Sequence, residues 1–138
     1  MQYVHPNDLW RVWQQIRPGI EEILEELNKE CLNELWLPED VYASIKKGES
    51  VLLFGEEGFV VFQIQADNYT QTKKFFVWLG CSFDPSTNVL ETAHQQLLDI
   101  AKQYQCQLME FKSSRRGWHR RAKDMGFYTG PTSYVMRI

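Results

Sequence analysis

The stretch FFVWLGCSFDPSTNVLETAHQQLLDIAKQY, residues 75–104, combines a strongly apolar run, a short loop and a helical pattern. A strand that leads through a loop into a helix often binds phosphate, because glycines let the loop approach the anion and the first helical amides face it. This loop has no glycine between Cys81 and Asn88, and it carries Asp84 and Pro85 instead. The stretch therefore matches a phosphate-binding element in outline and departs from one in its loop.

The segments around this stretch predict the other strands of a mixed sheet. Residues 50–66 form two apolar runs around Gly55-Glu56-Glu57-Gly58, which is the pattern of a β-hairpin. Residues 72–83 predict a long central strand, because their apolar side chains do not alternate with polar ones. Shorter strands are predicted at the following places: 1–4, 106–111, and two around Gly130-Pro131 within 127–138.

Helices are predicted between these strands from apolar spacing and capping residues. Asn7 is expected to cap a first helix, and Pro18 to begin a second, since proline suits a first turn. A third, short helix runs from Pro38 to a stop at Gly48. The helix at 88–104 is expected to bury one face, and a basic helix at 115–126 follows. The residues of that buried face are Leu90, Ala93, Leu97, Ala101 and Tyr104.

The resulting order is β-α-α-β-β-β-α-β-α-β-β, with the short third helix as an optional addition. It predicts an α/β fold with a mixed, mostly antiparallel sheet of six to seven strands flanked by helices. With 138 residues and 43% hydrophobic residues, the chain is expected to form one domain over 1–138. No apolar run is long enough to cross a membrane. The start MQYVHP lacks the basic and apolar regions of a signal sequence, so we expect a cytoplasmic protein.

The net charge of −3 is unevenly distributed. Residues 1–69 hold 5 Lys/Arg and 13 Asp/Glu, a balance of −8, while residues 70–138 hold 10 and 5, a balance of +5. This asymmetry favours an anionic partner near the C-terminal half. The three cysteines have no metal-ligand spacing, and no metal site is predicted.

The element order and several segments resemble the GNAT superfamily (Gcn5-related N-acyltransferases). The opening YVHPNDLWRVWQQI resembles the first strand and helix of that family, and the closing RRAKDMGFYTGPTSYVMRI resembles its last helix, which ends in Gly-Phe, and its terminal strand pair. More narrowly, IRPGIEEIL, LPEDVYASIKKGESVLL and FKSSRRGWHRRAKDMGF are similar to small GNAT-like proteins encoded by bacteriophages. The resemblance covers the whole chain.

The resemblance implies a site for acetyl-CoA between the strands at 72–81 and 107–112. The pantetheine arm would bind backbone amides of the first strand, and the pyrophosphate would lie at the start of the following helix. The implied cofactor-binding residues are Trp78, Leu79, Gly80, Cys81, Ser86, Thr87, Asn88 and Arg116. The family's Gln/Arg-x-x-Gly-x-Gly/Ala motif is replaced here by CSFDPSTNVLE, so the last three loop residues either bind phosphate through their side chains or simply cap the helix.

The catalytic residues are less clearly marked. Where the family often has a tyrosine in its last helix that protonates the thiolate, this chain has Ala122, and Arg115 replaces a frequent asparagine. His119 is a candidate general acid, or else a surface histidine. Glu110 could deprotonate an amine, or else pair with Lys112 in solvent. Tyr134 is a further candidate acid, or else a half-buried strand residue.

A basic cluster marks the C-terminal third of the chain. Its members are Lys112, Arg115, Arg116, Arg120, Arg121 and Lys123. They could bind CoA phosphates or an acidic protein surface, or they could form a solvated helix face. No nucleic-acid motif accompanies them, so nucleic acid is not an expected partner.

Two functions remain open from the sequence. The first is an N-acyltransferase that moves an acetyl group from acetyl-CoA to an amine. The second is a non-catalytic GNAT-like accessory protein of a bacteriophage, in the host cytoplasm or in the virion, whose fold binds a partner through Arg115, Arg116, Arg120 and Arg121. The intact scaffold fits both, while the glycine-free loop and Ala122 favour the second.

Overall fold

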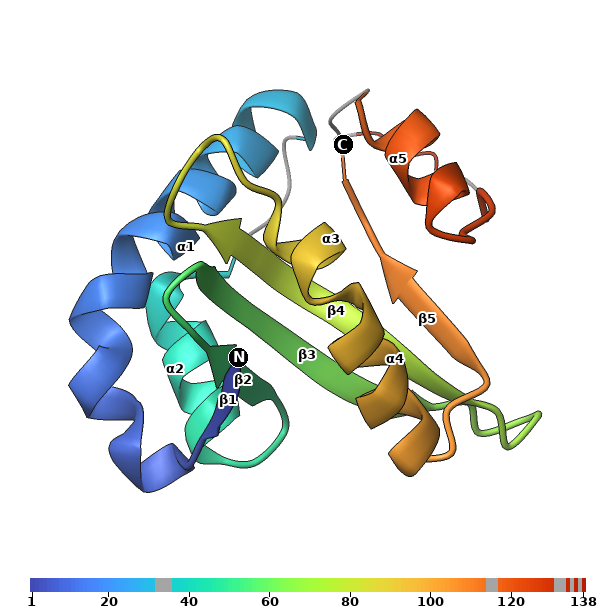
Figure 1. Cartoon of the computed structure of the whole chain (residues 1–138), viewed down its shortest axis with the longest axis horizontal. Helices are drawn as coiled ribbons and strands as arrows, with labels where there is room; N and C mark the ends of the chain where they lie inside the picture. The colour runs from blue at the N-terminus through green and yellow to red at the C-terminus, as the bar shows by residue number, and fades with distance from the viewer. Residues whose placement is uncertain (32–35, 114–116, 131–133, 135, 137) are drawn as a thin grey trace.

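The computed structural model describes residues 1–31, 36–113, 117–130, 134, 136 and 138, and of these it describes the backbone alone at 28–31. The fold is an α/β sandwich with a five-stranded sheet in the order β1-β2-β3-β4-β5 (Figure 1). The strands are β1 (Gln2–Val4), β2 (Val51–Phe54), β3 (Gly58–Ala66), β4 (Lys73–Ser82) and β5 (Leu108–Phe111). Neighbouring strands are antiparallel except for β4 and β5, which run parallel. The predicted fold class is confirmed, but the described residues form five strands and not six to seven.

Helices cover both faces of this sheet. They are α1 (Leu9–Cys31), α2 (Pro38–Lys46), α3 (Val89–Thr92), α4 (His94–Gln103) and α5 (Trp118–Asp124), and a 3₁₀ turn, η1 (Pro6–Asp8), precedes α1. One core cluster packs α1 and α2 against β2, β3 and the end of β4. A second cluster packs α3 and α4 against the opposite face. Each cluster buries fully enclosed aliphatic and phenyl side chains, which is the main favourable term in folding.

The N-terminal helix differs from the prediction of two helices. α1 continues through Pro18, although proline has no N–H to donate to the preceding turn. Ile16 and Ile20 are fully buried on either side of it, so the apolar face outweighs the lost hydrogen bond. Gly19 brings the helix close to the sheet, since an added Cβ would lie 2.7 Å from Cys81 Sγ. Asn7 is not a helix cap, because it lies within η1 and donates its N–H to His5 Nδ1.

The predicted short helix and hairpin are both present. α2 begins at Pro38 and its first turn is closed by the Leu37 N–H, which donates to Asp40 Oδ2 at 2.7 Å. Gly48 follows the helix with φ of 80°, a left-handed conformation in which glycine avoids the penalty of a Cβ. β2 and β3 then pair antiparallel around the short turn between Phe54 and Gly58.

A β-bulge interrupts β4 in its second half. Val61 of β3 pairs with Leu79 and Phe62 pairs with Val77, so Trp78 is an extra residue on β4. The bulge reverses which face each later side chain takes. Val77 lies in the core cluster beneath α3 and α4, whereas Leu79 lies in the cluster beneath α1 and α2. Simple alternation would place both side chains on one face.

The C-terminal third departs from the prediction in four respects. The helix predicted at 88–104 is divided at Ala93 into α3 and α4, and Tyr104 is 47% exposed and not buried. The helix predicted at 115–126 is shorter in the described residues, because α5 begins at Trp118 and ends at Asp124. Residues 127–130 form no strand. The remainder of the predicted strand pair includes 131–133, 135 and 137, which lie outside the described residues.

Candidate functional site

Strands β4 and β5 separate after a short paired segment. They are joined from Lys74–Leu108 to Val77–Phe111, and β4 then continues to Ser82. Figure 1 shows the two strands running together at their starts and diverging toward their ends. In the part of the chain that the structure describes, residues 78–82 therefore have no strand partner on the β5 side. We call this opening the splay.

The bulge at Trp78 lies where the splay begins. Because a bulge locally disrupts the ladder and turns the backbone, the amides and carbonyls that follow it are re-aimed relative to those before it. Gly80 faces α3, where an added Cβ would lie 3.1 Å from Leu90. The splay is therefore bordered by open strand backbone on one side and by the first turn of α3 on the other.

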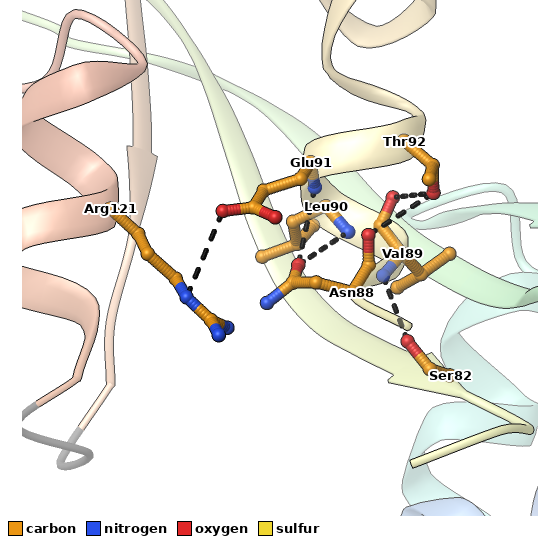
Figure 2. A network of polar contacts seen from close by, with 7 residues as sticks. All are labelled: Ser82, Asn88, Val89, Leu90, Glu91, Thr92 and Arg121. Atoms are coloured by element: carbon orange, nitrogen blue, oxygen red, sulfur yellow. Dashed lines mark hydrogen bonds and ion pairs between the residues drawn. The ribbon is translucent and has the colours of Figure 1, made fainter. Parts of the chain in front are cut away.

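The first turn of α3 is capped by the chain's own side chains (Figure 2). Asn88 Oδ1 accepts hydrogen bonds from the amides of Leu90 at 3.1 Å and Glu91 at 3.2 Å. Ser82 Oγ accepts one from the amide of Val89 at 2.8 Å. These are the amides that would otherwise be unpaired at the start of a helix. They are occupied in this structure, so they are not available to an anion unless these caps are displaced.

The loop before α3 folds around Asp84. Its carboxylate accepts hydrogen bonds from the Ser86 amide at 2.9 Å and the Ser86 hydroxyl at 2.8 Å. The amide and hydroxyl of Thr87 donate to the backbone carbonyl of the same aspartate. Ser86 and Thr87 thus stabilise the turn, and the first hydrogen bond, from the Ser86 amide, does most to lower the pKa of Asp84.

This turn gives a testable titration behaviour. The pKa of Asp84 is expected to lie below the ordinary value for aspartate, and Ser86→Ala is expected to move it back toward that value by removing one donor. Because the folded-state pKa is lowered, the stabilisation is present above the ordinary pKa and lost as the pH falls through the lowered one. An NMR titration of the Asp84 carboxyl group measures this. Thr87→Ala is the matched control, since Thr87 bonds the backbone carbonyl; an equal effect of both substitutions would contradict the assignment.

Helix α5 is held beside the splay by an aromatic cluster. Phe111 of β5 contacts Trp118 and Phe127 edge to face, with ring centroids 4.9 Å and 5.0 Å away. His94, the first residue of α4, packs on Phe127 and is hydrogen-bonded through Nε2 to the carbonyl of Met125 at 3.1 Å. Aromatic pairs of this geometry stabilise the fold by more than their buried area alone, so these contacts fix the position of α5 relative to β5 and α4.

The predicted catalytic residues do not converge. Glu110 lies in β5 opposite Phe76, close to the splay, and its Oε2 accepts a hydrogen bond from Lys74 Nζ at 2.9 Å. Its partner is thus Lys74 and not Lys112, whose Nζ lies over the Phe76 ring. His119 is exposed on α5 and makes no hydrogen bond with the described residues. Tyr134 is 96% exposed and belongs to no strand.

The predicted cofactor-binding residues fall into three groups. Trp78 and Gly80 are half-buried in β4, while the side chain of Leu79 is buried beneath α1. Cys81 is half-buried and packs against the same cluster. The loop residues Ser86, Thr87 and Asn88 serve the turn and the cap described above. Arg115 and Arg116 lie outside the described residues.

Two residues of the candidate site are not predicted by the sequence. Ser82 caps a helix whose first residue is seven positions later, and no capping pattern spans that separation. The sequence places Arg121 in the basic cluster without distinguishing it from the other basic residues. Among the described basic residues of α5, Arg121 alone forms an ion pair with α3, and its Nε lies 3.8 Å from Glu91 Oε1. The spacing of charged residues within one helix does not predict a contact with another helix.

A separate groove of about 580 Å³ runs between α1 and α2. It is lined by Arg17, Glu21, Leu24, Glu25, Leu37, Pro38 and Glu39. Arg17 bonds Glu21 through Nε at 2.8 Å and Glu39 through a terminal nitrogen at 2.7 Å, and these hydrogen bonds raise the pKa of Arg17. The pair to Glu39 links the two helices that cover this face of the sheet.

Among the residues that the structure describes, no helix combines the length and the apolar character that a bilayer span requires. In the same part of the chain no three His, Cys, Asp or Glu side chains are grouped so as to hold a metal ion.

Known structures share this architecture over the whole chain. A tetramutant of the BH1408 protein from Bacillus halodurans has a TM-score of 0.72 at 13% identity, with 99% of this chain and 98% of that chain covered. The ribosomal-protein-alanine N-acetyltransferase of Brucella melitensis has a TM-score of 0.68 at 12% identity and the same coverage. An acetyltransferase of Trypanosoma brucei has a TM-score of 0.61 at 14% identity, covering 99% and 97%.

The chain therefore has the GNAT-like α/β fold, which it shares with the BH1408 protein and with these two acetyltransferases. At such low identity the likeness extends to the fold alone. No protein-family model matches the sequence, and no curated protein matches it significantly.

Proposed function

We propose that the protein is an acyl-CoA-dependent N-acyltransferase that moves an acetyl group from acetyl-CoA to an amine. The observation that carries this proposal is the splay: β4 runs on to Ser82 beyond its pairing with β5, and the bulge at Trp78 lies where the opening begins. An open strand edge offers amides to a polar, extended arm such as pantetheine in the way it would to another strand. The site would be in the cytoplasm, where acetyl-CoA is available.

In this proposal the backbone of β4 binds the thioester arm and stabilises the transition state. Amides that follow Trp78 hold the thioester arm and stabilise the negative charge that develops on the carbonyl oxygen. The neutral amine nitrogen attacks the carbonyl carbon, a C–N bond forms, and the C–S bond breaks. The amine proton leaves through water, and the CoA thiolate takes up a proton. Binding and orientation of the two reactants supply a large part of the rate enhancement.

Glu110 is our candidate for receiving the amine proton. In β5 the side chains of Met109 and Phe111 join the core beneath α3 and α4, so Glu110 points to the opposite face, the one that α1 and α2 cover in part. Its carboxylate is already hydrogen-bonded to Lys74 Nζ at 2.9 Å, so we expect proton transfer through water. His119 and Tyr134, both exposed, remain candidates for protonating the thiolate.

Calorimetric titration and an acetylation assay test the function together. We expect acetyl-CoA to bind the wild-type chain and to be consumed in the presence of an amine acceptor. Glu110→Gln should leave the affinity for acetyl-CoA unchanged and lower turnover by about tenfold or more. Asp99→Gln on the exposed face of α4 is the control and should change neither quantity. No binding at millimolar acetyl-CoA would exclude the transferase function.

A non-catalytic role is the second candidate, and two observations favour it. The amides of Val89, Leu90 and Glu91 are capped, and Ala122 cannot transfer a proton. In this alternative the chain is a phage-encoded accessory or virion-associated module. It would bind an acidic protein surface through the basic cluster of its C-terminal third, including Arg120 and Arg121.

Asn88→Gly distinguishes the two candidates through a linked change in stability and affinity. Removing the cap should cost a few tenths of a kcal/mol of stability, since glycine is a tolerable helix cap. It should also free the amides of Leu90 and Glu91 and tighten acetyl-CoA binding several-fold. Thermal denaturation and calorimetry measure the two effects, with Asn68→Gly in the exposed β3–β4 turn as the matched control. An unchanged affinity in Asn88→Gly would count against phosphate binding at α3.

A further inference from the structure

The capped turn raises the question of which groups would hold the phosphates of an acyl-CoA. Asn88 and Ser82 occupy the first amides of α3, and the loop itself contributes the negative charge of Asp84. A diphosphate carries at least two negative charges and needs donors or cations close by. In this chain such groups must come from another element.

Arg121 of α5 reaches the required place. Figure 2 shows its side chain extending from α5 toward Glu91, in the first turn of α3 next to the Asn88 cap. The Arg121–Glu91 contact is an ion pair of 3.8 Å between side chains that are 57% and 44% exposed, too long for a hydrogen bond. Arg121 makes no hydrogen bond to any described residue, so its planar set of N–H donors is open to a ligand.

The position of Arg121 is set by packing at the other side of α5. Trp118 and Phe127 both contact Phe111 of β5, and the Met125 carbonyl is hydrogen-bonded to His94 of α4. These three contacts, to β5 and α4, hold the helix in place. The backbone that carries the Arg121 guanidinium is therefore fixed beside the first turn of α3. Preorganisation of this kind lowers the entropy lost on binding.

We propose that Arg121 is the phosphate-binding residue of the acyl-CoA site, taking the role that loop amides would otherwise have. This inference rests on the proposed transferase function. The phosphate replaces Glu91 as the partner of Arg121. An exposed, long ion pair is worth little, whereas a guanidinium binds phosphate oxygens in a bidentate, charge-assisted geometry.

The formal charges of the neighbouring side chains cancel. Glu91, Asp84 and Asp124 are negative and oppose an anion. Arg120, Arg121 and Lys123 are all exposed on α5, and neither Arg120 nor Lys123 has an ion pair with a described residue. Because three cations offset three carboxylates, the hydrogen-bonding geometry of the Arg121 guanidinium, and not a net positive potential, favours a phosphate here.

Calorimetry with acetyl-CoA tests the inference on four variants. Arg121→Gln should weaken binding by about tenfold, the range of one charge-assisted hydrogen-bonding group, and Arg121→Lys should recover part of the loss. Glu91→Gln should tighten binding, because it removes the group that competes for the guanidinium. Arg11→Gln is the control, an exposed arginine of α1 paired only loosely with Asp8, and it should bind as the wild type does.

Two further ligands separate the explanations. Acetyl-pantetheine, which lacks the phosphates, should bind the wild type and Arg121→Gln equally; a loss with this ligand too would show that Arg121 supports the fold and does not bind phosphate. ADP, which has the diphosphate without the arm, should bind more weakly than acetyl-CoA, and equal affinity would overturn the assignment to acyl-CoA. Equal binding of acetyl-CoA by wild type and Arg121→Gln would overturn this inference alone. Failure of the wild type to bind acetyl-CoA would overturn the proposed function itself.

Discussion

Replacing Gly58 by alanine is expected to lower the free energy of unfolding by about 3 kcal/mol or more. Gly58 begins β3 and pairs with Ser82 at the end of β4. A Cβ built there points directly onto the backbone carbonyl of Cys81 and lies 3.0 Å from the Ser82 Cα. Backbone atoms cannot rotate away as a flexible side chain can, so the start of the hairpin or the tip of β4 would have to move.

Chemical denaturation of Gly58→Ala beside Gly117→Ala measures this effect. Gly117 has open space around its Cβ direction and an ordinary helical backbone, so its substitution should change stability by no more than ~0.5 kcal/mol. Two variants of equal stability would mean that the β3–β4 junction is less tightly constrained than described. The result bears on function because Ser82 and Cys81 form the end of the strand that borders the splay.

Deleting Trp78 should remove the bulge and leave the two core clusters in place. Trp78 is the extra residue of the bulge, and its loss would return β4 to simple alternation. Leu79, which is 2% exposed, would then follow Val77 directly and stay on the α1 side of the sheet, and Gly80 would stay on the α3 side. We expect a loss of stability of about 3 kcal/mol from the missing indole, and a loss of acetyl-CoA binding, since the amides after the bulge would no longer have their present orientation.

Trp78→Ala is the matched control for this deletion. It removes the indole, including its edge-to-face contact with Trp36 at 5.5 Å, but keeps the backbone length and hence the bulge. Both variants should fold cooperatively and retain the two core clusters, but only the deletion should lose acetyl-CoA binding in calorimetry. A deletion variant that binds acetyl-CoA as Trp78→Ala does would show that the bulge does not orient the amides that hold the ligand.

Much of the fold could be predicted from local signals in the sequence. The hairpin around Gly55 and Gly58, the short helix from Pro38, and the strand–loop–helix unit after Lys73 each have turn, cap or periodicity signals that agree with one another. The bulge could not be predicted, because the run FFVWLGC is apolar at every position and so carries no alternation to reverse. Pro18 predicts a helix boundary, but α1 continues through it, because burial of the apolar face on both sides of the proline outweighs the hydrogen bond that the proline cannot make.

Parts of the candidate site that depend on neighbouring residues in the sequence could be predicted. Contacts between elements that are distant in the sequence could not. Asn88 has the residue type and position of a helix cap, and the structure has that cap. Arg121 and Glu91 lie far apart in sequence, and their contact depends on how α5 packs on Phe111 and His94. For Glu110 the sequence leaves open a role as a base or a pairing with Lys112, two positions away, and the strand register brings Lys74 beside it and not Lys112.

The fold and the loop point in different functional directions. The GNAT-like fold, the splay and the bulge agree with the proposed transferase function, while the capped first turn of α3 removes amide donors that could bind phosphate. In the proposal Arg121 supplies this contact, because a guanidinium on α5 can bind phosphate oxygens without any free loop amide. The central claim is thus that the splay binds acyl-CoA through the backbone of β4 and the side chain of Arg121.

Calorimetric titration of the wild-type chain with acetyl-CoA, and separately with acetyl-pantetheine, tests this claim most directly. We predict saturable binding of both ligands, with acetyl-CoA the tighter by about tenfold and its advantage reduced by added salt, since phosphate contacts are electrostatic. Absence of heat and of thermal stabilisation at millimolar acetyl-CoA would contradict the account.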